Sequence, residues 1–270
     1  MSIGRVALAF LRKDFLEEIS YRFALLLGVV ALFVSLFFIS VFSDFVGELV
    51  ADRLVEYRGN YFAFVVLGIG VYQFLQSTLY ELSRRIRQAQ VVGTLEALLG
   101  TRTPLGITIL CMPLYPLLET SLNVLGILAL GALFFGLELD PRGIPAAALV
   151  LALTAAAFAG LGLCAAGLTV AFKRAEAVPS FLASVSLFLG GVWYPIEALP
   201  GWLQTLAQAL PLTHALEAMR RAMLAGASIP EVLPSLAALS ATALVLVPLG
   251  YVAFRWSVRR AMRDGTLTQY

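Results

Sequence analysis

Side chains able to do acid, base or nucleophilic chemistry are scarce in this sequence. The 270 residues contain a single histidine, His214, so a metal site built from two histidines is excluded, and a lone imidazole beside apolar segments is typical of an amphipathic filler. Glu119 is the acidic residue inside an apolar run, where a charged carboxylate costs about 2.5–3.5 kcal/mol. It is either a polar pathway residue or proton-sensitive switch, or a carboxyl group hydrogen-bonded to Thr120, Asn123 or a neighbouring helix.

The lysines exclude nucleotide hydrolysis of the P-loop type. Lys13 follows Arg12 and Lys173 follows Phe172, whereas a phosphate-binding loop places glycine before its lysine. The sequence therefore identifies no catalytic residue, no metal site and no cofactor within the chain. Nucleic acid is not an expected partner either.

The composition is that of an integral membrane protein, with 60% hydrophobic and 13% charged residues. Apolar runs of about 20 residues are typical of membrane-spanning helices. We expect one all-α transmembrane domain over residues 1–270, with six spans at 23–42, 61–80, 105–137, 144–172, 178–194 and 233–256. The third run is overlong and contains Pro113 and Pro116, which predicts a kink, a tilt or a part outside the bilayer. In the fourth, Gly160, Gly162 and Gly167 predict close helix packing.

Charge fixes the expected orientation. Placing both termini and the loops after spans two and four on one side gathers 14 of the 19 Lys and Arg residues there. The positive-inside rule makes that side cytoplasmic, so we expect a multi-pass protein of a prokaryotic plasma or inner membrane with both termini in the cytoplasm. Residues 1–20 predict an interfacial helix on the inner leaflet, with Leu8 and Phe15 on its apolar face. The alternative is a charged extension of the first span.

Polar residues recur at helical spacing on the second span. Gln73, Gln76 and Tyr80 need partners at membrane depth, which predicts that they face other helices or a wet pathway. Together with Glu119 and Asn123 on the third span, they are the candidate substrate-pathway residues.

Residues 195–224 follow the fifth span but form neither a span nor a polar loop. The fifth span ends in Trp193, Tyr194 and Pro195, which are typical of an interface. The apolar stretch beyond, which includes Trp202, is cut into short pieces at Pro200, Gly201 and Pro211. We expect an outer re-entrant helical segment in which the four aromatic and proline residues Trp193, Tyr194, Pro195 and Trp202 form a gate; the alternative is a long outer loop lying on the membrane.

Two stretches resemble the type 2 ATP-binding-cassette (ABC) exporter permeases. The run GGVWYPIEALPGWLQTLAQALPLTHALEAMR is similar to the C-terminal signature of that family. The matching positions are Gly190, Gly191, Pro195, Leu199, Pro200, Pro211, Leu212, Thr213 and Arg220. The run GTLEALLGTRTP, within a predicted cytoplasmic loop at 84–103, is similar to the loop that carries the family's coupling helix. Its matching positions are Gly93, Thr94, Leu95, Glu96, Leu98, Leu99 and Pro104, whereas Gln90 and Val91 stand where many members carry acidic residues.

The resemblance implies a half-transporter without its own nucleotide site. It would pair with a second permease copy or a paralogue and with two ABC ATPase subunits that bind ATP and Mg. Alternating access would export an amphipathic substrate, such as a drug, a lipid or a lipid-linked glycan, with membrane lipids as neighbours. The coupling loop has an alternative interpretation as an amphipathic helix on lipid headgroups. The alternative function is an intramembrane lipid-modifying enzyme that uses Glu119, and a scaffold is a third possibility.

Overall fold

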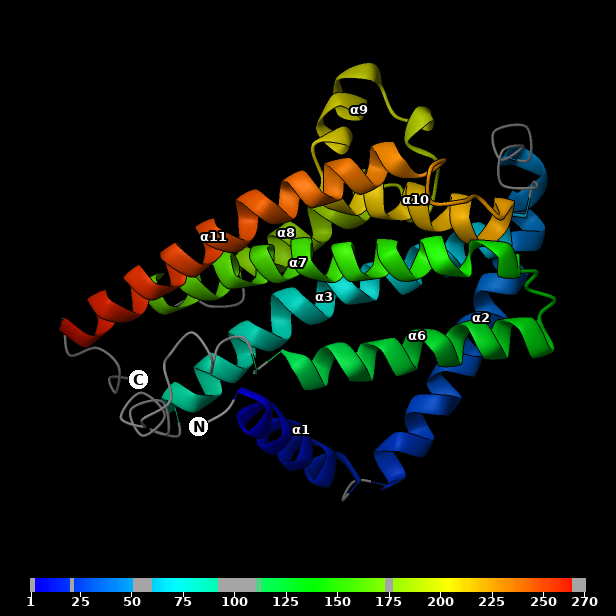
Figure 1. Ribbon diagram of the computed structural model, residues 1–270. Helices are drawn as coiled ribbons and strands as arrows, with labels where there is room; N and C mark the ends of the chain where they lie inside the picture. The colour runs from blue at the N-terminus through cyan, green and yellow to red at the C-terminus, as the bar shows by residue number, and fades with distance from the viewer. Residues whose placement is uncertain are drawn as a thin grey trace.

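The computed structural model describes residues 3–19, 22–50, 60–91, 111, 113–172 and 177–263, and within them the chain is helical with no strand (Figure 1). This confirms the all-α expectation. The α-helices are α1 (Ile3–Ile19), α2 (Arg22–Val50), α3 (Tyr61–Val91), α6 (Leu114–Phe134), α7 (Ile144–Phe172), α8 (Ala177–Leu189), α9 (Gly201–Gln208), α10 (Pro211–Ala225) and α11 (Leu233–Arg263). Two short 3-10 helices, η3 (Pro141–Gly143) and η4 (Ile196–Ala198), lie between them.

Five helices in the described part of the chain are long and apolar enough to cross a membrane. They contain the stretches Leu26–Gly47, Tyr61–Arg85, Leu114–Phe134, Pro141–Leu168 and Leu233–Arg260. The expected fifth span, 178–194, instead contains a helix of only 13 residues. Such a helix is about 20 Å long, which is short of the roughly 30 Å hydrocarbon core. Six complete spans are therefore not confirmed.

Glycine explains why α8 ends early. Gly191 has φ +83°, a left-handed conformation that stops a helix and that side chains other than glycine rarely adopt. A Cβ at Gly190 would lie 2.4 Å from the Ser186 carbonyl oxygen and 2.8 Å from Leu212 Cδ2. The chain therefore leaves α8 as a tight turn packed against the start of α10.

The prolines of the third span lie at the start of α6, and the predicted kink, tilt or part outside the bilayer stays a prediction. Pro113 is the N-cap of α6 and Pro116 lies in its first turn, where a missing N–H costs no helical hydrogen bond. The described helix then runs for 21 residues and ends before Gly136, which has φ +66°. Residues 105–110 of the predicted span lie outside the described residues.

α3 is the central helix. It packs against α2, α6, α7, α8 and α10, and Phe64, Leu75 and Leu79 are among the most buried large side chains of the protein. α7, which packs against α3, also runs next to α11 along most of its length (Figure 1). A Cβ at Gly160 would lie 2.7 Å from the Leu246 backbone of α11, and one at Gly162 would lie 2.5 Å from the Thr78 carbonyl oxygen of α3. The predicted role of these glycines in close packing is confirmed.

The segment after α8 is broken where the sequence predicts. Pro200 is the N-cap of α9 and Pro211 occupies the first turn of α10, so each proline begins a new helix. Gly226, with φ +69°, ends α10. η4, α9 and α10 are thus three separate pieces, while their re-entrant course through a bilayer stays a prediction.

Candidate functional site

The non-helical turn after α8 carries three consecutive carbonyl groups that are bound by side chains from other elements. A broken helix end inside an apolar structure exposes backbone oxygens, which need donors. Here Arg220 of α10 serves two of them: Nη1 donates to the Gly191 oxygen at 2.9 Å and Nη2 to the Val192 oxygen at 3.0 Å. The Tyr61 hydroxyl of α3 donates to the Trp193 oxygen at 2.9 Å.

Arg220 also binds α3. Its Nε donates to the Phe64 carbonyl oxygen at 3.1 Å, and its guanidinium carbon lies 3.3 Å from the centroid of the Phe64 ring. The Phe64 ring in turn stacks on Tyr61, with centroids 6.4 Å apart and planes 14° from parallel. One guanidinium therefore joins α10, α3 and the turn after α8. We call this group, Tyr61, Phe64, Arg220 and the carbonyls of residues 191–193, the carbonyl clasp.

Burial makes the clasp a strong constraint. Arg220 is 4% exposed, and a buried cation must be held by hydrogen bonds or charge, so its geometry is fixed by the oxygens around it. Gly68 makes the room: a Cβ there would lie 2.6 Å from Arg220 Nη2 and 2.6 Å from the Val192 oxygen. The clasp holds three elements in register, and its groups are suited to positioning rather than to catalysis.

The predicted gate residues lie beside the clasp, with one exception. Trp193 is half-buried against the core, Pro195 is buried, and the Tyr194 hydroxyl donates to the Phe188 carbonyl oxygen of α8. Trp202 of α9 is 68% exposed. Structure thus gathers Trp193, Tyr194 and Pro195 at the end of α8, and their role as a gate stays a prediction.

The polar stripe of α3 is partly engaged within the protein. Gln76 Nε2 donates to the Tyr72 hydroxyl at 3.2 Å, and that hydroxyl donates to the Ala183 carbonyl oxygen of α8 at 3.1 Å. Gln73 and Tyr80 are half-buried.

The two polar residues of α6, Glu119 and Asn123, are both exposed. Among the described residues, no group of three or more His, Cys, Asp or Glu side chains could hold a metal ion. The role of Glu119, in a substrate pathway or in a lipid-modifying enzyme, stays a prediction.

The opposite end of α3 is tied to α1 by an ion pair. Arg85 Nη1 lies 2.5 Å from Asp14 Oδ2, and Lys13 Nζ lies 3.3 Å from Asp14 Oδ1. Asp14 is 5% exposed, so α1 is anchored to α3 at this point. Leu8 and Phe15 of α1 are exposed, as the interfacial interpretation requires, although its position in a membrane stays a prediction.

The candidate coupling residues Gly93, Thr94, Leu95, Glu96, Leu98 and Leu99 lie outside the described residues. Sequence reasoning matched Arg220 to a family signature without giving it a role, and it missed Tyr61, Phe64 and Gly68 altogether. One signal was present: Thr213, Leu216, Arg220 and Leu224 recur at helical spacing, which places a cation on the face of α10 that all four bury.

The described residues form a multi-helix protein with five helices long and apolar enough to cross a membrane. The sequence matches the ABC-2 type transporter family over residues 8–224, so this chain belongs to that family of membrane transport permeases.

Known relatives match a shorter part of the sequence. Nodulation protein J of Neorhizobium galegae is 36% identical over 90 residues, covering 33% of this chain and 34% of that protein. Nodulation protein J of Rhizobium leguminosarum bv. trifolii is 36% identical over 75 residues, covering 28% and 29%. The match thus spans about a third of the length of these relatives.

Proposed function

We propose that this chain is the permease subunit of an ATP-driven exporter that moves an amphipathic substrate, such as a drug, a lipid or a lipid-linked glycan, out of the cytoplasm or inner leaflet. The observation that carries the proposal is the ABC-2 transporter family match over residues 8–224. Membership of that family implies association with an ABC ATPase. Two ATPase subunits and a second permease copy or paralogue complete the proposed complex.

The architecture of α3 supports a mechanical role. This single helix of 31 residues is about 46 Å long, with the carbonyl clasp on its first turn and the Asp14–Arg85 pair near its last turns. The predicted coupling residues 93–99 follow directly after it. A push from an ATPase on that loop would reach both ends of α3, and alternating access would follow if α3 moved together with the turn at 191–193 that the clasp binds to it.

The proposal is tested by a charge placed in the coupling loop. Leu98→Asp puts a carboxylate where an apolar ridge would enter a groove of the ATPase, so we expect it to abolish stimulation of ATP hydrolysis and transport while membrane insertion is kept. The measurement is ATPase activity of the partner subunit in proteoliposomes with and without the permease.

Gln208→Asp, which adds the same charge at an exposed position of α9, is the matched control and should leave stimulation intact. Equal stimulation by Leu98→Asp and by the unaltered chain would contradict docking at this loop. Transport by the permease without any ATPase would contradict the whole proposal.

A further inference from the structure

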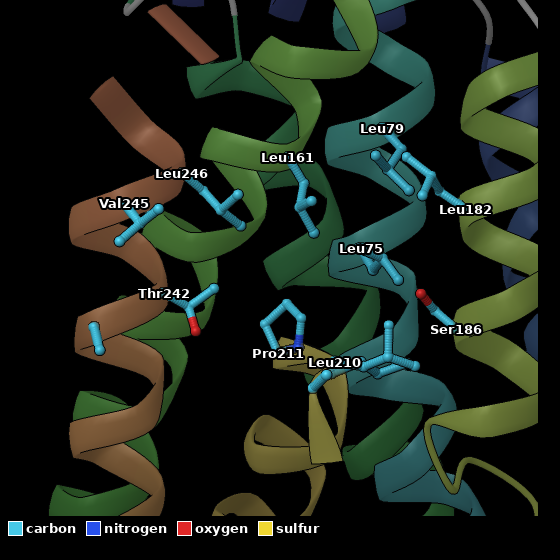
Figure 2. A pocket seen from close by; sticks show the side chains of 13 residues that line it. Leu75, Leu79, Leu161, Leu182, Ser186, Leu210, Pro211, Thr242, Val245 and Leu246 are labelled. Atoms are coloured by element: carbon cyan, nitrogen blue, oxygen red, sulfur yellow. The ribbon is translucent and has the colours of Figure 1, made fainter. Parts of the chain in front are cut away.

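A second feature, separate from the clasp, is a cavity of about 490 Å³ between five helices (Figure 2). Leu75 and Leu79 of α3 and Leu161 of α7 line it, and Figure 2 shows Thr242 of α11 and Ser186 of α8 on opposite walls. Leu210 and Pro211, at the start of α10, lie between these walls, below the centre of the view. The volume falls within the range of about 300–1,000 Å³ that is usual for small-molecule sites.

The lining is suited to a hydrocarbon ligand. Most of its side chains are Leu, Val, Ala or Pro. The Thr242 hydroxyl donates to the Ala238 carbonyl oxygen of its own helix at 2.8 Å, so its polar group is already satisfied. Ser186 contributes the other hydroxyl of the lining. A buried water molecule needs two to four polar partners, so two hydroxyls, one of them already bonded, favour an apolar ligand over water.

The surroundings of the cavity indicate which hydrocarbon fills it. Val245 lines the cavity and is also 63% exposed, and its neighbour Leu244 is 75% exposed. The outer face of α8 is apolar as well: Phe181 and Phe188, which do not line the cavity, are 68% and 62% exposed. The cavity is thus continuous with an apolar outer surface on a helix of membrane-spanning length, and the medium at such a surface is lipid.

We propose that this cavity binds one acyl chain of a bilayer phospholipid, inserted between α8 and α11. The site reaches the end of α8 through Leu212, which lines the cavity and lies 2.8 Å from the position of a Cβ on Gly190. A bound chain would therefore pack on the start of α10, next to the turn that follows α8. The proposal concerns a resident lipid and not the transported substrate, so it does not depend on coupling to an ATPase.

The test is photolabelling of the full chain, without an ATPase, in vesicles of phosphatidylethanolamine and phosphatidylglycerol. The vesicles contain a phospholipid with a diazirine in one acyl chain, and labelled peptides are mapped by mass spectrometry. We expect labels at residues 182–186 of α8 and 242–246 of α11. Ser186→Leu and Thr242→Leu, which fill the cavity from opposite walls, should each lower this labelling several-fold.

Leu244→Phe is the control variant, because Leu244 is exposed but does not line the cavity, and its labelling should be unchanged. Two filling variants keep the test valid if one fails to reach the membrane, and thermal melting shows that each remains folded. Delipidated protein should also gain thermal stability when phospholipid is returned, and the filled variants should gain less. Unchanged labelling of folded, filled variants, or equal labelling at exposed positions such as Leu249 and Val252, would overturn the proposal.

Discussion

Replacing Arg220 by methionine tests whether the carbonyl clasp holds the end of α8 in place. The change keeps an unbranched aliphatic stem but removes the donors of three hydrogen bonds of 2.9–3.1 Å. The Gly191 and Val192 oxygens would lose the Arg220 donors, at about 1–3 kcal/mol each, so the two together cost about 2–6 kcal/mol. Loss of the contact with the Phe64 ring adds about 0.5–2 kcal/mol.

Part of that loss is offset, because the variant no longer buries a charge. Burying a guanidinium costs several kcal/mol, which makes a net destabilisation of about 2–5 kcal/mol the expected outcome for Arg220→Met. The measurement is the free energy of unfolding in mixed detergent micelles, together with the rate of limited proteolysis in residues 195–200. Both should show a loosened turn after α8.

Three variants separate the clasp from a general effect of charge. Arg220→Lys keeps the charge without the planar fork and should be intermediate. Gly68→Ala should act in the same direction as Arg220→Met, because its Cβ would lie 2.6 Å from Arg220 Nη2. Arg221→Met is the control: Arg221 pairs with Glu217 at 3.4 Å on a partly exposed face, so about 1 kcal/mol or less is expected.

The proposed role of the clasp is refuted if Arg220→Met has the same free energy of unfolding as the unaltered protein and the same rate of proteolysis in residues 195–200. It is also refuted if Arg221→Met is as damaging as Arg220→Met, since the effect would then belong to α10 as a whole.

Two further predictions concern helix contacts. Gly160→Ala should destabilise the protein by about 1–3 kcal/mol, because its Cβ would lie 2.7 Å from the α11 backbone. Gly28→Ala, whose Cβ would have no atom within 4 Å, should be neutral or slightly stabilising. The free energy of unfolding in micelles measures both, and equal effects of the two variants would contradict the packing account. Asp14→Arg and Arg85→Asp should each weaken ATPase stimulation and the anchoring of α1, and the double variant should restore both in part. ATP hydrolysis measures the stimulation, and proteolysis between α1 and α2 measures the anchoring. A double variant no better than either single variant would argue against the ion pair.

Continuous apolar runs in the sequence predict the long helices correctly, but they do not predict where the short helix α8 of the expected fifth span ends. Continuous apolar runs predict spans because hydrocarbon selects length and polarity, and five of the predicted runs are helices of that length. In 178–194, hydropathy continues past Leu189, whereas the backbone turns at Gly190 and Gly191. The stopping point depends on a left-handed glycine and on Leu212 packed against the turn, and hydropathy carries no information on either.

The candidate site was less predictable for the same reason. Aromatic and proline residues at 193–195 locate the end of the span, because they are typical of interfaces. The donors that satisfy its carbonyls come from Tyr61 and Arg220, which are 132 and 28–29 residues away. Such pairing is set by tertiary packing, and a single sequence reveals only that a cation lies on the buried face of α10.

The carbonyl clasp and the Asp14–Arg85 ion pair lie toward opposite ends of α3, so the properties of this helix decide whether they can act together. α3 has no proline, and most of its span is buried among five neighbouring helices, so it resists bending. At Arg85, α1 is joined to α3 through Asp14. In the proposed exporter, we expect a displacement near Arg85 to reach Tyr61 and Phe64, beside the bound carbonyls of Gly191, Val192 and Trp193. In the proposed exporter, the same rigidity that makes the clasp stable makes it responsive to force at the other end of α3.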